Sequence, residues 1–165
     1  MEFSEEQIHN LIKGRIGEVF AECILKESGY TILPYGYEHY LGYLANKVPE
    51  SKNIREILAV TRMTPDFIVL SNKNDNCFFI EAKFRKNLDI GRFIEEQVKP
   101  IDEFWKKVHF FVMTSKPPYF YYDFVNTILK NRSIRALKDW GHEIGISKAV
   151  IEKYERIAEK VMHFY

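Results

Sequence analysis

Two carboxylates and one ammonium group stand in this chain where they could act together on a phosphodiester. Glu81 and Lys83 are two residues apart in the apolar run Cys77–Phe84, which favours a β-strand, so both side chains should point to one face. Asp66 begins a second apolar run, and the polar segment Ser71–Asn76 between the two runs is typical of a turn. The runs should therefore form a hairpin in which Asp66 comes level with Glu81.

Charged side chains set among Phe, Ile, Val and Leu cost free energy unless they are paired or bound to a metal ion. We therefore expect Asp66 and Glu81 to bind Mg²⁺, with Mn²⁺ able to substitute, because Mg²⁺ typically accepts one or two protein carboxylates and keeps water and phosphate oxygens as its other ligands. Such a cation polarises a phosphoryl oxygen and lowers the pKa of a bound water. Lys83 would add a compact positive charge near the attacking water or the developing negative charge, and the expected reaction is hydrolysis of a P–O bond.

A second Glu-x-Lys triplet, Glu50-Ser51-Lys52, serves as an internal comparison. It follows Pro49 in a polar segment without an apolar strand around it, so we interpret it as a solvated loop or helix start. The strand context and the upstream Pro65-Asp66 separate the Glu81 and Lys83 pair from this copy.

The order Pro65-Asp66, fourteen intervening residues and Glu81-Ala82-Lys83 resembles the motif of the PD-(D/E)xK nuclease superfamily. The resemblance implies an α/β fold of the restriction-endonuclease-like type, with an αβββαβ core and a mixed central sheet flanked by helices. It favours DNA over RNA as the substrate and an endonuclease as the activity. The residues themselves do not decide between the two nucleic acids.

The segment Gly14-Arg15-Ile16-Gly17-Glu18 resembles the first helix of archaeal Holliday-junction-resolvase-like branches of that superfamily. By this resemblance Glu18 is a candidate catalytic residue and metal ligand, directly or through water, although a lone Glu off the apolar stripe is more often solvated. Gln97 lies where some branches carry a supporting glutamine, but Ile101 stands where the helicase-associated nucleases have a tyrosine. Gln97 also fits an ordinary polar helix position.

The remaining pattern predicts the elements that position these residues. We expect a nuclease core over 1–115 with an insertion at about 36–60, followed by a C-terminal helical extension over 116–165 packed on the core. Within these parts the expected elements are a helix from Ser4 to near Gly29, a strand over Tyr30–Tyr37, strands over Asp66–Leu70 and Cys77–Phe84, a helix over Ile90–Lys106 kinked at Pro100, a strand over Val108–Thr114, and mostly helix over Tyr119–Tyr165.

Basic residues form two groups that could contact nucleic acid. The candidate contacts are Arg85, Lys86, Arg92, Arg132 and Arg135. Each group is equally compatible with an ordinary solvated face. The segment from Ile134 through Gly141–Gly145 to Val161 could form a helix-turn-helix, for which the favoured alternative is a pair of helices covering the sheet or forming a dimer contact.

Composition narrows the class of protein. The longest apolar stretches are far shorter than a membrane span, so we expect a cytoplasmic, soluble protein that does not enter membranes. Cys23 and Cys77 suggest neither a disulfide framework nor a zinc site, and we expect both to be small core residues. A single small site cuts one strand, so cleavage of both strands of a duplex or of a junction would require a symmetric pair of sites. Homodimerisation is expected on this ground alone.

Two other functions compete with the nuclease. One is a catalytically inactive module of the same fold that binds nucleic acid or supports assembly, against which the intact Asp66, Glu81 and Lys83 set speaks. The other is a helix-turn-helix DNA-binding protein with an incidental α/β domain, which would lose DNA binding on truncation after Ser115.

Overall fold

The computed structural model describes residues 4–35, 64–72, 76–105 and 107–163. The predicted insertion at about 36–60 and its Glu50-Ser51-Lys52 triplet lie outside the described residues.

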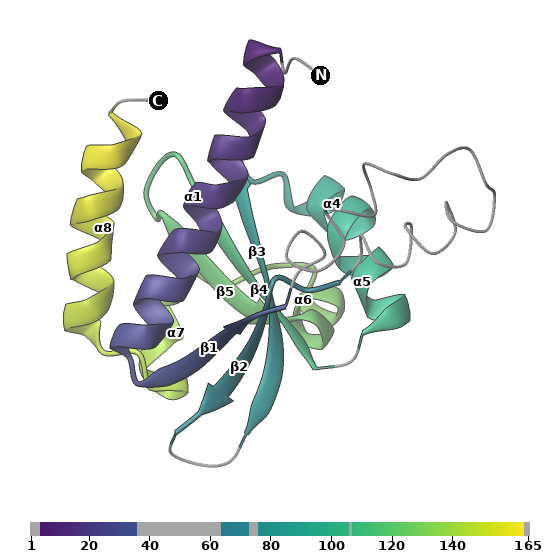
Figure 1. Ribbon diagram of the computed structural model, residues 1–165. Coiled ribbons are helices and arrows are strands. Elements are labelled where there is room, and N and C mark those ends of the chain that lie inside the picture. Colours follow the sequence, from purple (N-terminus) through teal and green to yellow (C-terminus); the bar gives the residue numbers. More distant parts are fainter. Residues whose placement is uncertain (1–3, 36–63, 73–75, 106, 164–165) are drawn as a thin grey trace.

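A five-stranded mixed sheet forms the centre of the fold, with its strands side by side in chain order (Figure 1). β3 and β4 are parallel, and the other three neighbouring pairs are antiparallel. The predicted hairpin is present as β2 and β3, and the α/β class is confirmed. The strands are β1 (Tyr30–Pro34), β2 (Phe67–Ser71), β3 (Cys77–Arg85), β4 (Val108–Thr114) and β5 (Phe120–Phe124).

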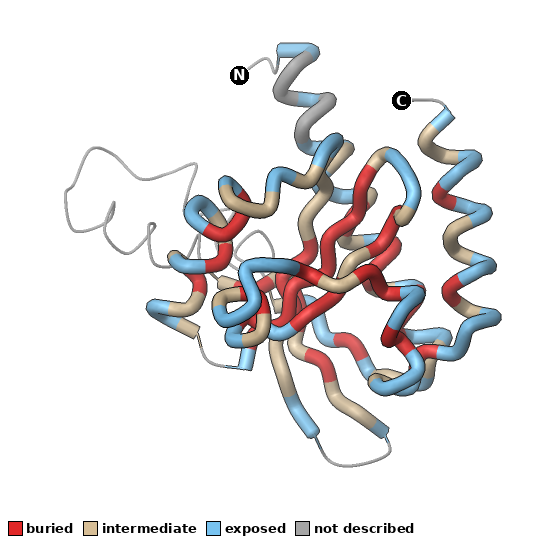
Figure 2. Tube along the Cα trace, turned by 180° about the vertical axis from the view of Figure 1, so that it is seen from behind, coloured by how far each residue is buried: buried red, intermediate tan, exposed pale blue. Residues whose placement is uncertain are grey.

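Helices cover both faces of the sheet. α1 (Glu5–Glu27) and α8 (Lys148–Met162) lie against one face, while α4 (Ile90–Phe93), α5 (Lys99–Phe104) and α6 (Val125–Asn131) lie against the other (Figure 1). All seven residues of β4 are buried, as expected for a strand covered on both faces. Figure 2 shows buried residues following the strands through the middle of the molecule and exposed residues on the outer helices.

The helix predicted over 90–106 changes its winding part-way. Between α4 and α5 the turn η1 (Ile94–Val98) is π-helical, and α5 carries Pro100 in its first turn. Because proline has no N–H to donate to the preceding turn, an irregularity is expected next to it, and it falls just before Pro100. A proline also ends β1 at Pro34, and the predicted strand over Tyr30–Tyr37 is shorter than expected within the described residues.

The expectation that the chain is mostly helical after residue 119 is wrong at its start. Phe120–Phe124 forms β5, which pairs with β4 at the edge of the sheet. The aromatic side chains of this run suit a pleated, half-buried surface better than a helix, and Phe120 and Tyr122 are buried in the core. The C-terminal extension therefore contributes a strand to the sheet as well as helices.

Beyond β5 the chain forms α6, the single turn α7 (Leu137–Trp140), the 3₁₀ turn η2 (Gly141–Ile144) and α8. α8 packs along α1, where Lys153 and Tyr154 both bind the Glu27 carboxylate at 2.6 and 2.9 Å. This arrangement matches the favoured alternative to a helix-turn-helix, in which the C-terminal helices cover the sheet. A four-residue α7 also provides little of the first helix that a helix-turn-helix needs.

Two further observations bear on the class of protein. Within the described residues, none of the helices combines the length and apolar character required to traverse a bilayer. Cys23 and Cys77 are both exposed free thiols, so the expectation that they are core residues is wrong.

Candidate active site

β3 presents Glu81 and Lys83 on one face of the sheet. Phe79 shares that face and packs with the α4–α5 side, whereas Ile80 and Ala82 point to the core beneath α1. The Lys83 Nζ and the Glu81 Oε1 form an ion pair, with the carboxylate buried and the ammonium half-buried. The two-residue alternation of a strand thus holds the charges side by side, as the sequence predicts.

The side chain of Asp66 contacts the backbone of β3 between these two residues. It immediately precedes Phe67, which pairs with Ile80 in the β2–β3 register. From there the Asp66 Oδ2 accepts a hydrogen bond of 2.7 Å from the backbone N–H of Ala82, the residue between Glu81 and Lys83. The predicted convergence of Asp66 with Glu81 is therefore present, and a specific bond anchors it.

α1 approaches the same strand at Gly17. A Cβ atom added to Gly17 would lie 3.2 Å from the Lys83 carbonyl carbon and 3.3 Å from the Phe84 amide nitrogen, tighter than nine in ten real Cβ contacts. The absence of a side chain therefore lets the helix lie directly on the strand backbone. Glu18, the next residue, is thereby placed beside the site and is ion-paired with Arg15.

The pKa of Glu81 is raised from 4.5 to about 7. Burial is the largest cause, because a carboxylate loses hydration in an apolar environment. The ammonium of Lys83 opposes this shift, whereas the negative charges of Asp66 and Glu18 add to it. Two carboxylates, one from the residue before β2 and one from α1, therefore act electrostatically on Glu81 of β3.

The pKa of Lys83 is also raised, although burial acts on its ammonium in the opposite direction. Burial alone would lower the pKa of its ammonium, but the neighbouring carboxylates of Glu81 and Asp66 outweigh that effect and raise the pKa above its ordinary value. Lys83 therefore keeps its proton at neutral pH.

The site offers a partial donor set for a metal ion. The Glu81 Oε2 is buried and has no hydrogen-bond partner among the described residues, although a buried carboxylate oxygen normally requires one. A cation bound by Glu81 and Asp66 would satisfy this atom. In the part of the chain that the structure describes, however, three or more His, Cys, Asp or Glu side chains do not gather into a metal-binding group. The donor set fits an ion such as Mg²⁺, which takes few protein ligands.

Gln97 lies in the π-helical turn η1 and is half-buried. No hydrogen bond joins it to the carboxylates within the described residues, so its supporting role stays a prediction. The carboxylate of the neighbouring Glu96 acts electrostatically on Arg85, one of the predicted basic contacts. Sequence patterns give no signal for Glu96, which occupies an ordinary polar helix position.

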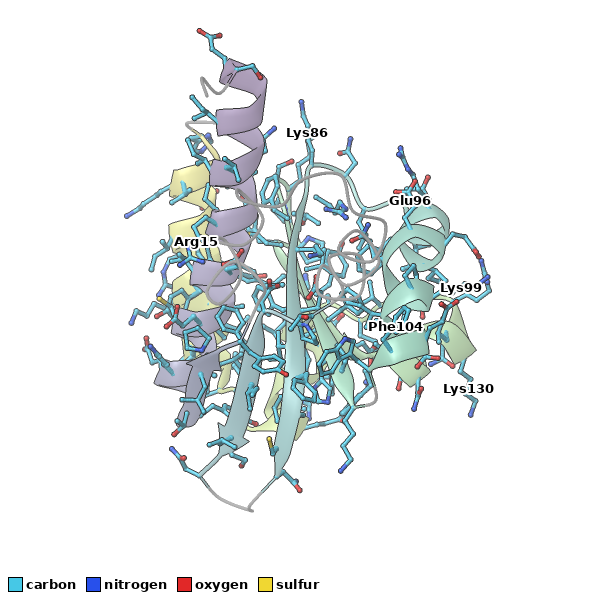
Figure 3. All side chains as sticks on the ribbon, turned by 45° about the vertical axis from the view of Figure 1, so that its right-hand side comes forward. Arg15, Lys86, Glu96, Lys99, Phe104 and Lys130 are labelled. Carbon is cyan, nitrogen blue, oxygen red and sulfur yellow. The ribbon has the colours of Figure 1, made fainter. Side chains whose placement is uncertain are left out.

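Three of the predicted basic contacts gather near the C-terminal end of β3. Burial lowers the pKa of Arg85, an effect that Glu96 opposes and Arg92 reinforces. Arg92 is exposed and is ion-paired with Glu96 at 2.7 Å. Figure 3 shows Lys86 projecting from the end of β3 and Glu96 from the neighbouring helical turn. These positive groups border the carboxylate site.

The other two predicted basic contacts lie apart from the carboxylate site. Arg132 lies just after α6 and comes within 3.8 Å of Glu95. Arg135 places its Nε and Nη2 on the buried carboxylate of Asp123 at 2.8 and 2.9 Å, and its guanidinium stacks 3.7 Å from the centre of the Trp140 ring. The structure thus gives Arg135 a role in fastening the segment before α7 to β5.

Comparison with known proteins adds no relative to this picture. No protein-family model, no curated protein and no solved structure gives a significant match to the chain.

Proposed function

We propose that this chain is a metal-dependent nuclease that hydrolyses phosphodiester bonds in DNA as an endonuclease. The observation that carries the proposal is the Glu81 and Lys83 ion pair on β3, with Asp66 hydrogen-bonded to the backbone N–H between them. A buried carboxylate whose second oxygen lacks a partner costs stability, and such arrangements are concentrated at functional sites.

Asp66 and Glu81 would hold Mg²⁺ or Mn²⁺, with Glu18 joining them directly or through water. When bound, the cation would polarise a phosphoryl oxygen and acidify a water molecule. The restriction-endonuclease-like class and the PD-(D/E)xK superfamily belong to the same proposal, which rests on the motif and on the succession of one helix, three strands, a helical segment and a strand.

Lys83 acts as an electrostatic group in this mechanism. Because its pKa is raised, it is protonated at neutral pH and cannot serve as a general base. Its ammonium instead stabilises the negative charge that develops on the phosphoryl oxygens during attack. Glu81 holds this ammonium in place, and the bond from Asp66 to the Ala82 N–H fixes the strand that carries both residues.

The basic residues at the end of β3 would position the substrate. Arg85, Lys86 and Arg92 border the carboxylate site, and positive groups near such a site can bind the phosphates on either side of the scissile bond. A homodimer enters the proposal only if both strands of a duplex or a junction are cut, since a single site cuts one strand.

The test is incubation of supercoiled plasmid, linear duplex, four-way junction, single-stranded DNA and RNA with Mg²⁺, Mn²⁺ or EDTA. We expect metal-dependent nicking of the plasmid, which identifies an endonuclease because a circle has no end. Lys83→Met should abolish cutting. Lys99→Met is the matched control, because Lys99 is an exposed lysine of α5 that pairs at 2.7 Å with Glu95 of η1. If the wild type cuts nothing with either metal, the enzyme proposal fails, and DNA binding without cutting would favour the inactive module.

A further inference from the structure

A cavity lies at the end of the sheet where β3 and β4 begin and β5 ends, and residues from both faces of the sheet line it. Its volume is about 740 Å³, within the range of small-molecule sites. Its lining includes Cys77 and Phe78 at the start of β3, His109 at the start of β4, and Tyr122 and Phe124 towards the end of β5. Ligand sites of this size are typically apolar and aromatic with a few fixed polar groups, and this lining has that character.

His109 is the fixed polar group of the cavity. Its side chain is 93% shielded from solvent, and its Nδ1 lies 2.5 Å from the Tyr122 hydroxyl. Burial lowers the pKa of His109 to about 4, against an opposing effect of Asp123, so the imidazole is neutral at pH 7. Burial also raises the pKa of Tyr122 well above its ordinary value, so the hydroxyl keeps its proton.

These protonation states fix the tautomer of His109. The hydrogen of the Tyr122 hydroxyl has no other acceptor among the described residues, so donation to the His109 Nδ1 leaves the fewest polar groups of the pair unsatisfied. The neutral ring must then carry its hydrogen on Nε2. This Nε2–H has no partner within the described part of the chain, and a bound molecule in the cavity that His109 lines could accept a hydrogen bond from it.

Aromatic rings surround this donor. Phe78 stacks on His109 with a centroid distance of 4.3 Å and an angle of 9°, and Phe124 lies 4.2 Å away at 62°. Trp105 also lines the cavity, and its ring packs on Phe79 with a centroid distance of 5.1 Å. Flat rings of this kind bind other flat rings by stacking, and unpaired N–H groups favour a ring whose edge accepts hydrogen bonds.

The charges at the cavity do not favour a phosphate. Among the described residues of the lining, Glu143 and Asp102 carry carboxylates and Lys107 carries an ammonium. The ligand is therefore better matched as an uncharged ring than as a nucleotide with phosphates.

We propose that this cavity is a binding site for a nucleoside, with the base stacked against the Phe78 and Phe124 rings and an acceptor on its edge bonded to the His109 Nε2–H. This site is separate from the proposed nuclease site and does not depend on nuclease activity. The shared chemistry of purines and pyrimidines, a flat ring with acceptor nitrogen or carbonyl groups, is what the cavity recognises.

The wild-type protein offers a direct test, because each of its two cysteines is exposed and only Cys77 lines the cavity. Adenosine, guanosine, cytidine and thymidine should each be titrated while alkylation of both thiols by iodoacetamide is followed by mass spectrometry. A bound nucleoside should slow alkylation of Cys77 and leave Cys23 on α1 unchanged. We expect a dissociation constant on the order of 0.1 mM for at least one nucleoside, as suits a ligand of this size.

Two variants sharpen the result. His109→Phe keeps a flat ring but removes the Nε2–H, and it should weaken binding by about 10-fold or more. Asp66→Asn should bind the nucleoside as the wild type does, which separates this site from the proposed nuclease site. Shifts of the Trp105 indole N–H signal in wild-type protein give an independent readout if His109→Phe fails to fold.

The proposal is overturned if none of the four nucleosides protects Cys77 or shifts the Trp105 signal. It is also overturned if folded His109→Phe binds them as the wild type does, or if free indole and phenol bind as tightly as the nucleosides. The last result would mean that the cavity takes aromatic rings without reading their edges, as a docking site for a protein side chain would.

Discussion

The carboxylate of Asp66 and the backbone N–H of Ala82 are joined by a hydrogen bond of 2.7 Å that crosses from the start of β2 to the middle of β3. Ala82 is the residue between Glu81 and Lys83, so this bond fixes the strand at the point where the two charged side chains leave it. Asp66 thus has a structural part, as an acceptor, and a proposed chemical part, as a charged metal ligand.

These two parts can be separated by substitution. Asp66→Asn keeps an oxygen acceptor for the Ala82 N–H but loses the charge, whereas Asp66→Ala loses both. We expect both variants to lose nuclease activity by about 100-fold or more. Only Asp66→Ala should lose stability, by about 1–3 kcal/mol, because it leaves the Ala82 N–H without its partner. Plasmid nicking and urea unfolding measure the two effects, and an active Asp66→Asn would contradict the assigned role.

The contact between α1 and β3 predicts a contrast between two glycines of one helix. Gly17→Ala forces a Cβ against the backbone of Lys83 and Phe84, which should lower stability by about 1–3 kcal/mol and displace Glu18 from the site. Gly14→Ala is the matched control, because a Cβ there meets nothing within 4 Å. It should stabilise the helix by about 0.5–1 kcal/mol. Equal effects of the two substitutions in thermal unfolding would refute the close packing.

Most of the sheet follows from local patterns, which is why it could be predicted. The polar turn between two apolar runs indicates the β2–β3 hairpin, and the apolar run around His109 indicates the buried β4. β5 is not indicated in the same way, because Asp123 stands within its aromatic run and a carboxylate buried in a sheet needs a compensating partner. Only the folded chain supplies the compensating partner, Arg135, from twelve residues further on.

The candidate site likewise contains some features that local sequence patterns predict and others that depend on contacts between distant elements. The shared face of Glu81 and Lys83 follows from strand alternation alone, and the level of Asp66 follows from the hairpin. The packing of Gly17 on β3 and the electrostatic effect of Glu18 on Glu81 depend on how a helix lies on a sheet. Such contacts between distant elements leave no periodic signal in the sequence, and Glu18 was identified only through a resemblance.

Asp123 should be among the most important residues for stability in the C-terminal extension. It is fully buried, and both of its oxygens accept from Arg135, with the Phe124 N–H as a further donor at 3.0 Å. Asp123→Ala should cost about 2–4 kcal/mol, less than for a fully buried pair because the Arg135 side chain is 40% exposed. Glu95→Ala removes an exposed carboxylate and should change stability by less than about 0.5 kcal/mol. If Asp123→Ala and Glu95→Ala lowered the free energy of unfolding in urea by similar amounts, the structural role of Asp123 would be contradicted.

The raised pKa of Glu81 predicts a pH dependence of stability with a definite sign. A carboxyl whose pKa is about 7 in the folded protein and near 4.5 in the unfolded chain holds its proton more tightly when folded. Between pH 4.5 and 7 the unfolded chain therefore binds fewer protons, and stability falls as the pH rises through this window. The contribution is at most about 3 kcal/mol, and it levels off above pH 7.

Glu81→Gln isolates this effect, since the amide cannot ionise. The free energy of unfolding should be measured with urea at pH 5, 6, 7 and 8 without divalent ions. It should decrease less with rising pH in the variant than in the wild type, so that the variant's advantage in stability is largest at pH 8. The same variant should be inactive as a nuclease, so that greater stability accompanies loss of function, as expected of a carboxylate held at a cost for chemistry. A wild-type and a Glu81→Gln profile that run parallel from pH 5 to 8 would show that Glu81 ionises at its ordinary pKa.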